Sequence, residues 1–482
     1  MDLERLIAAL APRQVLRPAA ADVLDLSYDA RTVEPGFLFF CVPGLRADGH
    51  DFAAEAVERG AVALVVERRL EVAVPQLVVE DARRAMADAA AEFFGHPSRE
   101  LRVAGVTGTN GKTTTTFLLY AMLAAAGLRP GLLGTVETRI GGERRQALRT
   151  TPEAVDLQRL LREMVDVGDS SCAMEATSHG SALKRLAGLR LSVLVFTNLT
   201  QDHLDLHGTM ERYFEAKRSL FTEGDPPPAA VNIGDPYGRA LTDELRSLRL
   251  APLLTFGFAP DAEITAEGLE LSLRGARFSA AGIDLASPLL GRFNVENVLG
   301  AVAAARILGL PDEAIAIGAA SVRGVPGRFE SIDEGQPFLV VVDYAHTPGS
   351  LENVLQEARE LAEGRVVCVF GCGGDRDREK RPMMGRAASE GSDVAIVTSD
   401  NPRSEEPDAI IRSILDGVTR PVEIEPDRRL AIARAVEIAA PGDLVLIAGK
   451  GHEQGQEAGG KTVPFDDREV AREALRRLGA KA

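Results

Sequence analysis

The sequence has little of what marks a secreted or a membrane-spanning protein. Its 482 residues include only 4 cysteines, too few for the disulfide framework of a secreted domain. No apolar run approaches the roughly 18 residues that a membrane-spanning helix needs. Acidic side chains occur within residues 1–5, unlike the start of a secretion signal. We therefore expect a cytoplasmic protein.

Positive charge is also in deficit. Asp and Glu number 71 against 55 for Lys and Arg, which gives a net charge of −16. An acidic surface repels nucleic-acid backbones and anionic lipids, so we expect neither nucleic acid nor membrane as a partner. Hydrophobic residues at 45% and charged residues at 26% are typical of a folded globular chain rather than a disordered one.

Short apolar runs alternate with amphipathic stretches along the chain, which is the pattern of parallel α/β units. The length suggests about three domains. The polar stretch at 96–99 and the Gly-Val-Pro-Gly stretch at 324–327 indicate two linkers. We predict domains at residues 1–97, 98–326 and 327–482, with a period-two antiparallel segment near 264–278. The clearest predicted strands are residues 37–42, 61–66, 101–106, 172–174, 191–196, 338–342, 366–370, 394–398 and 444–448, and the clearest helices are 51–59, 113–126 and 350–362.

The most informative stretch is residues 106–114, Val-Thr-Gly-Thr-Asn-Gly-Lys-Thr-Thr. A strand, a loop with two glycines and a helix that opens on Lys-Thr form a phosphate loop, in which backbone N–H groups and a helix N-terminus face the phosphates. Lys112 would reach the terminal phosphates and the Thr113 hydroxyl would ligate Mg²⁺. The common pattern has glycine at position 106, where this chain has valine, so a chance Gly-Lys-Thr is the alternative. The predicted ATP-binding loop comprises Gly108, Thr109, Asn110, Gly111, Lys112, Thr113 and Thr114.

This form of the loop resembles that of the Mur ligase family, ATP-dependent amide-forming enzymes of peptidoglycan precursor synthesis. Further matches extend from Tyr28 to Glu453. The resemblance implies three α/β domains: an N-terminal UDP-binding domain, a central P-loop ATPase-like domain with a parallel sheet, and a C-terminal Rossmann-like domain that binds the incoming amino acid. It also implies ATP as co-substrate and Mg²⁺ as cofactor.

The second domain contains the implied catalytic side chains. Glu175, in Met-Glu-Ala-Thr-Ser-His, follows a short apolar strand, where a Mg²⁺-binding carboxylate is usual, although alone it would more often be a surface acid. The resemblance makes His203 a ligand of a second Mg²⁺. Lys217 cannot ligate a metal as an ammonium, and the resemblance implies that CO₂ converts it to a carbamate. The predicted catalytic residues are Lys112, Glu175, His203 and Lys217. The predicted metal ligands are Thr113, Glu175, His203 and the carbamate of Lys217.

The resemblance also implies a site for a UDP-sugar peptide. Ala30 stands where the family usually has serine, so that contact is not carried over. The implied substrate-binding residues are Arg46, Thr150, Thr151, Thr177 and Arg185.

Four further residues are implied neighbours of ATP: Asn294, Arg328, Asp343 and His346. Asp343 and His346 follow a predicted strand, and ligands of open α/β sheets bind at the carboxyl ends of strands. Since these residues come from two domains, we expect the domains to close around ATP.

The stretch Asp-Asn-Pro-Arg at 400–403 resembles the motif of family members that add meso-diaminopimelate, whereas lysine-adding members generally lack the arginine. Diaminopimelate has a second carboxylate, which a guanidinium binds through two parallel hydrogen bonds. Glu453 could hold the distal ammonium. The implied amine-binding residues are Arg376, Asp400, Asn401, Pro402, Arg403, Gly449 and Glu453.

Together these features predict a monomeric ligase that joins meso-diaminopimelate to the D-glutamate γ-carboxylate of UDP-N-acetylmuramoyl-L-alanyl-D-glutamate. The reaction would pass through an acyl phosphate and form ADP and phosphate. Within the family, the alternatives are a lysine-adding or a D-Ala-D-Ala-adding ligase. Outside it they are a P-loop ATPase switch, a non-catalytic UDP-sugar-binding module, and a folate or cyanophycin ligase.

Overall fold

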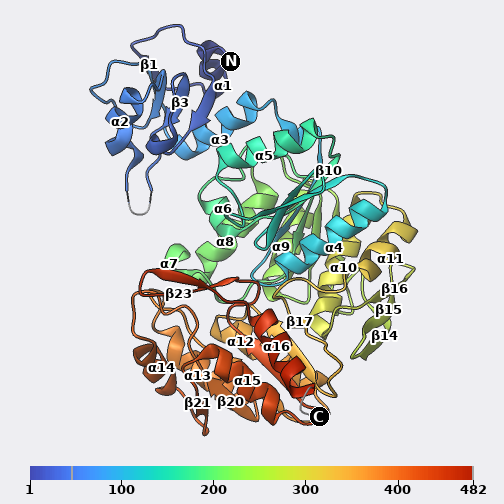
Figure 1. Ribbon diagram of the computed structural model, residues 1–482. Coiled ribbons are helices and arrows are strands. Elements are labelled where there is room, and N and C mark those ends of the chain that lie inside the picture. Colours follow the sequence, from blue (N-terminus) through green and yellow to red (C-terminus); the bar gives the residue numbers. More distant parts are fainter. Residues whose placement is uncertain (45–46, 480–482) are drawn as a thin grey trace.

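The structure, a computed structural model, describes residues 1–44 and 47–479 (Figure 1). Three α/β parts follow one another along the chain, and the central part lies between the N-terminal and C-terminal parts. Each has its own sheet and its own buried cores, so the expected three-domain α/β architecture is confirmed. The boundaries at residues 97 and 326 stay predictions. None of the described helices is long and apolar enough to cross a membrane.

The N-terminal domain is built on a five-stranded sheet in the order β1-β5-β4-β3-β2. Neighbouring strands are parallel except for β1, which pairs antiparallel with β5. Helix α3 begins where the Asp81 side chain accepts hydrogen bonds from two backbone N–H groups, a typical N-cap. The elements are α1 (Leu3–Leu10), β1 (Gln14–Leu16), β2 (Asp25–Ser27), β3 (Phe37–Phe40), α2 (Ala53–Glu58), β4 (Ala63–Val66), β5 (Gln76–Val78) and α3 (Ala82–Phe93).

The central domain has an eight-stranded sheet in the order β13-β12-β11-β6-β10-β7-β8-β9. The strands from β13 to β7 are parallel, and β8 and β9 continue the sheet as an antiparallel hairpin. Successive side chains of β6 point to opposite faces of the sheet, so Val103 and Ala104 belong to different buried cores. Both are buried because helices cover both faces of the sheet. Its strands are β6 (Arg102–Thr107), β7 (Pro130–Leu133), β8 (Glu137–Ile140), β9 (Glu143–Gln146), β10 (Ser171–Glu175), β11 (Val193–Phe196), β12 (Ala229–Asn232) and β13 (Leu253–Phe256).

The expected antiparallel segment of this domain is a separate three-stranded sheet, β14 (Glu267–Ser272), β15 (Gly275–Ala280) and β16 (Ile283–Ser287). The helices of the domain are α4 (Lys112–Ala125), α5 (Ala154–Asp166), α6 (Ser178–Ala182), α7 (Leu204–His207), α8 (Met210–Thr222), α9 (Pro236–Leu248), α10 (Arg292–Ile307) and α11 (Asp312–Ser321).

The C-terminal domain has a six-stranded sheet in the order β17-β18-β22-β19-β20-β21, in which only β17 is antiparallel to its neighbour. A hairpin, β23–β24, lies apart from this sheet. The strands are β17 (Glu330–Ser331), β18 (Leu339–Asp343), β19 (Val366–Phe370), β20 (Val394–Val397), β21 (Glu423–Ile424), β22 (Leu444–Ala448), β23 (Gly455–Ala458) and β24 (Lys461–Pro464). The helices are α12 (Pro348–Leu361), α13 (Lys380–Gly391), α14 (Pro407–Leu415), α15 (Arg428–Ile438) and α16 (Asp467–Gly479).

Candidate active site

The phosphate loop joins the end of β6 to the start of α4. Gly108 and Gly111 have positive φ angles of 147° and 82°, which side chains disfavour. A Cβ on Gly108 would overlap the Thr197 hydroxyl, and one on Gly111 would overlap the Asn297 amide oxygen. Both glycines are therefore required by backbone conformation and by space.

A second segment, directly after β11, fixes the shape of this loop. The Asn198 carbonyl accepts a hydrogen bond from the Thr109 N–H at 2.9 Å, and the Asn198 side-chain oxygen accepts one from the Asn110 N–H at 2.9 Å. The Thr197 hydroxyl donates to the Asn110 carbonyl at 2.6 Å. The segment that follows β11 thus fixes the backbone conformation of the loop.

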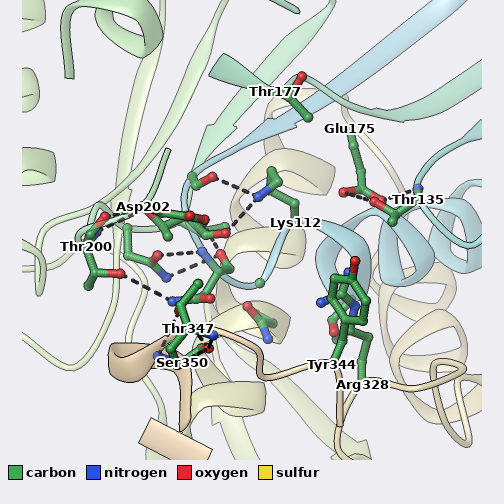
Figure 2. Close-up of a pocket in the computed structure, with 18 of the residues that line it drawn as sticks. Lys112, Thr135, Glu175, Thr177, Thr200, Asp202, Arg328, Tyr344, Thr347 and Ser350 are labelled. Atoms are coloured by element: carbon green, nitrogen blue, oxygen red, sulfur yellow. Dashed lines mark hydrogen bonds between the residues drawn. The ribbon is translucent and has the colours of Figure 1, made fainter. Parts of the chain in front are cut away.

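Lys112 lies in the mouth of the loop, where its ammonium donates to the carbonyls of Gly108 and Thr109 at 3.0 and 2.7 Å. Burial lowers the pKa of Lys112, and the negative charge of Glu175 partly opposes this shift. Figure 2 shows Lys112 and Glu175 on the central-domain side of the site, with Arg328, Tyr344, Thr347 and Ser350 approaching from the C-terminal domain.

Glu175 ends β10 and is 1% exposed. Its carboxylate accepts hydrogen bonds from the Thr113 hydroxyl at 3.0 Å and from the Thr135 N–H and hydroxyl at 2.7 and 3.0 Å. A carboxylate beside a hydroxyl supplies the hard oxygen ligands that Mg²⁺ prefers. No group of three or more His, Cys, Asp or Glu side chains in the described ranges could hold a metal.

His203 and Lys217 line the same cavity as the loop. Burial lowers the pKa of His203 to about 4, so the ring is neutral and able to ligate a metal at neutral pH. Lys217 is 1% exposed, and its ammonium donates to the Gly108 carbonyl at 2.8 Å. Burial lowers the pKa of Lys217 well below its usual value, and the positive charge of Lys112 adds to the shift. The phosphate loop therefore lies beside a buried lysine that loses its proton more readily than an exposed lysine does.

These residues surround one cavity of about 710 Å³ between the central and C-terminal domains. Most of the predicted catalytic, ATP-binding and UDP-substrate residues line it: Gly108, Thr109, Asn110, Gly111, Lys112, Thr114, Thr150, Thr151, Glu175, Thr177, Arg185, His203, Lys217, Arg328, Asp343 and His346. Thr113 does not line the cavity, but its hydroxyl donates a hydrogen bond to the Glu175 carboxylate, which does. Lining residues that the sequence did not indicate include Thr135, His179, Asp202, Tyr213, Asn297 and Tyr344.

The wall expected to hold the UDP-sugar peptide is rich in threonine and arginine. The Thr177 hydroxyl donates to the Thr151 hydroxyl at 2.9 Å, and the Thr151 hydroxyl donates to the Glu175 carbonyl at 2.9 Å. Arg185 forms a 2.7 Å ion pair with the buried carboxylate of Glu153. Arg149, and Arg83 of the N-terminal domain, share that carboxylate. Arg46 lies outside the described residues.

Three family models match successive parts of the chain: "Mur ligase family, catalytic domain" at residues 24–94, "Mur ligase middle domain" at 106–305, and "Mur ligase, glutamate ligase domain" at 327–451. A protein of Solibacter usitatus named UDP-N-acetylmuramoyl-L-alanyl-D-glutamate--2,6-diaminopimelate ligase is 46% identical, over 99% of either chain. The chain belongs to the Mur ligase family. It is accordingly an ATP-dependent ligase, and the resemblance found in the sequence is confirmed.

Two further comparisons agree with this assignment to the Mur ligases. A protein of the same name from Geobacillus thermodenitrificans is 47% identical, over 99% of both chains. A solved structure with this ligase name in its title is 35% identical, has a TM-score of 0.70, and covers 95% of each chain.

Asn294 of this Mur ligase does not line the cavity. It is 2% exposed, and its amide donates to the Leu290 carbonyl at 2.8 Å and accepts from the Asn297 amide at 2.9 Å. Asn297, three residues later on the same face of α10, is the one beside the phosphate loop. The Asn-x-x-Asn spacing was the signal for this second asparagine.

The C-terminal wall of the cavity is organised by Asp343 at the end of β18. Its carboxylate accepts the N–H groups of Phe329 and Ala345, both at 2.7 Å. Burial raises the pKa of Asp343, and the guanidinium of Arg328 opposes this shift. That guanidinium lies 4.7 Å from the centre of the Tyr344 ring. The predicted cluster of Arg328, Asp343 and His346 is thus brought together at the cavity.

The residues predicted to bind the amine also lie together, but they do not line the cavity. Arg403 donates to the Gly374 carbonyl at 2.7 Å and lies 3.3 Å from Glu457. Arg376 and Arg403 both flank Gly373, and the Asp400 carboxylate lies against Gly449.

The Glu453 carboxylate of this cluster already has partners. It accepts from the Asn401 amide at 2.7 Å and from the buried ammonium of Lys450 at 3.2 Å. Lys450, which sequence reasoning missed, also donates to the Asn401 side-chain oxygen at 2.9 Å. The Glu453 carboxylate is therefore already paired with the ammonium of Lys450.

Proposed function

We propose that this Mur ligase adds meso-diaminopimelate to UDP-N-acetylmuramoyl-L-alanyl-D-glutamate, with conversion of ATP to ADP and phosphate, in peptidoglycan precursor synthesis. One observation carries the proposal: the phosphate loop and the threonine–arginine wall face each other across a single cavity. That arrangement suits a reaction between a nucleotide phosphate and an anionic substrate. The names of the full-length relatives supply the substrate identities.

The loop would hold the nucleotide through its N–H groups and through Lys112. Glu175 and Thr113 fit a first Mg²⁺, because they offer a carboxylate and a hydroxyl beside the loop. Bound Mg²⁺ would offset the repulsion between the substrate carboxylate and the γ-phosphate, which costs several kcal/mol at close range.

Lys217 is proposed to react with CO₂ before catalysis. Its neutral amine would attack the carbon of CO₂, a C–N bond would form as one C=O π bond opens onto oxygen, and one proton would leave to water, so that an anionic carbamate replaces the neutral amine. The lowered pKa supports this step, since only the neutral amine is a nucleophile. With the neutral ring of His203, the carbamate would offer ligands for a second Mg²⁺.

Bond formation would follow in two steps. The γ-carboxylate of the D-glutamate residue attacks the γ-phosphorus, the bond to ADP breaks, and an acyl phosphate forms. The amine of diaminopimelate then attacks the carbonyl carbon, loses a proton, and expels phosphate. Arg185 would hold the anionic UDP-substrate against the loop during both steps, through its charge and its position in the wall.

Recognition of the amine is assigned to the C-terminal cluster. Arg403 would bind the distal carboxylate of diaminopimelate as a bidentate pair, with Arg376 beside it. Since this cluster does not line the cavity in this arrangement, the proposal requires the C-terminal domain to move toward the central domain during the cycle. We further propose a cytoplasmic location, in keeping with the buried, free state of all 4 cysteines.

The test is phosphate release from ATP in the presence of UDP-N-acetylmuramoyl-L-alanyl-D-glutamate, with meso-diaminopimelate, L-lysine or D-Ala-D-Ala supplied in turn. We expect turnover with meso-diaminopimelate alone. Turnover with lysine instead would retain the ligase and reject the amine assignment. Hydrolysis that is indifferent to every amine would reject the proposed function.

A further inference from the structure

The N-terminus of α10 is completed by a side chain from another domain. Gly291 precedes the helix and has no side chain to cap it. Instead, the Glu357 carboxylate of α12 accepts a hydrogen bond from the Arg292 N–H at 2.7 Å and is also hydrogen-bonded by the Phe293 N–H. A carboxylate in this place satisfies helix N–H groups that lack an intrahelical partner and suits the positive end of the helix dipole.

The same turn of α10 is anchored in the C-terminal domain by apolar contacts. Leu290 belongs to the buried cluster that contains Phe329 and the residues on one face of β18 and β19. The rings of Phe293 and Phe329 meet edge to face, with centroids 5.3 Å apart. A helix of the central domain thus begins inside the packing of the C-terminal domain.

Farther along, α10 meets the phosphate loop. The Asn297 side-chain oxygen faces Gly111 so closely that a Cβ there would overlap it, and it accepts a hydrogen bond from the Thr115 hydroxyl at 3.5 Å. Asn297 and Glu357 line the same cavity. One rigid element therefore connects the C-terminal domain, at Glu357, to the nucleotide-binding loop, at Gly111.

We propose that Glu357 is a positioning residue that couples the seating of the C-terminal domain to nucleotide binding through α10. The inference rests on the proposed function, since it requires the loop to hold a nucleotide. When the C-terminal domain is seated, Glu357 caps α10 and Asn297 is held against the loop. When the domain swings away, the helix loses its cap, and Leu290 and Phe293 lose apolar cover. A nucleotide that binds better to the seated form shifts the population toward it.

The test compares Glu357→Ala and Glu357→Gln with Glu360→Ala as a matched control. Glu360 is an exposed acid one turn along the same helix. The dissociation constants of ADP and of a non-hydrolysable ATP analogue are measured by calorimetry. The radius of gyration is measured by X-ray scattering with and without nucleotide.

We expect Glu357→Ala to raise both dissociation constants about fivefold, the typical effect of one lost helix cap, and to abolish the compaction on nucleotide binding. Glu357→Gln keeps an acceptor oxygen and should stay within about twofold of the unmodified chain. Glu357→Lys should weaken binding more than alanine does, because it adds a cation at the positive helix end. Glu360→Ala should change neither quantity.

Unchanged dissociation constants in folded Glu357→Ala and Glu357→Lys would overturn the coupling, as would an equal effect of Glu360→Ala. Failure of the unmodified chain to bind nucleotide would instead overturn the proposed function together with this inference. The two failures are therefore distinguishable.

Discussion

The ammonium of Lys217 and the carbonyl of Gly108 are joined by a 2.8 Å hydrogen bond, although 109 residues separate them in the sequence. The lysine of α8 is thereby placed against the first glycine of the phosphate loop, with its pKa lowered by burial. The two residues connect the nucleotide site to the position where a carbamate is proposed.

Lys217→Ala should reduce kcat by at least about 100-fold, because removal of one group that stabilises transition-state charge typically has that effect. Acetate should restore part of the activity by supplying a carboxylate in the vacated space. Exposed Lys461 provides the matched control, and Lys461→Ala should retain full activity. Steady-state phosphate release measures all of these. Full activity of Lys217→Ala would remove this lysine from the mechanism.

Gly108→Ala should weaken nucleotide binding at least about tenfold, because the new Cβ would overlap the Thr197 hydroxyl and distort the loop. Gly127→Ala is the control. Gly127 has a similarly unfavourable φ of 77° but open space around the missing Cβ. Calorimetric titration with ADP separates the two variants. Equal affinities would show that the loop tolerates a side chain at this position.

Arg403→Ala should raise the KM for meso-diaminopimelate by a factor equivalent to about 2–5 kcal/mol, the usual cost of truncating one partner of a charge-assisted pair. The affinity for L-lysine, which lacks the second carboxylate, should not change. The control is Arg434→Ala, a half-exposed arginine that pairs with Glu423. Equal losses with both amines would mean that Arg403 acts on the fold and not on the distal carboxylate.

The free energy of unfolding should fall as the pH is lowered from about 6.5 toward 4. Burial holds the pKa of His203 at about 4 in the folded chain, whereas the unfolded value is about 6.5. Within this window the unfolded chain binds a proton that the folded chain does not, so acid favours unfolding. Urea unfolding at pH 7 and pH 5 should show a smaller drop for His203→Gln than for the unmodified chain. An identical drop would assign the effect to other groups, such as His452, whose pKa burial also lowers to about 4.

Local patterns were enough to predict the parts of the site that lie within one strand–loop–helix unit. The loop from Gly108 to Lys112 and the strand ends at Glu175 and Asp343 occur where expected, because glycine spacing and apolar runs report directly on backbone conformation. The period of two at residues 264–278 similarly indicated β14 and most of β15, whereas the third strand of this antiparallel sheet, β16, was not predicted.

Contacts between distant segments could not be predicted from these patterns. Thr135 reaches Glu175 only because β7 and β10 are neighbours in the sheet. The hydrogen bond from Lys450 to Asn401 and the cap that Glu357 gives α10 depend on how loops, helices and domains pack. No period or motif in the sequence encodes such packing.

The hydrogen bonds from Thr197 and Asn198 to the phosphate loop have a consequence for how such loops are searched for and transplanted. Residues 107–114 do not determine their own conformation, since the segment after β11 is hydrogen-bonded to four of their backbone groups. A chimera that received only the glycine-rich octapeptide would have the sequence of the loop but would lack the hydrogen bonds that fix its conformation. The portable unit is a pair of segments about ninety residues apart, and a profile that scores them jointly would describe the binding element more faithfully than the octapeptide alone.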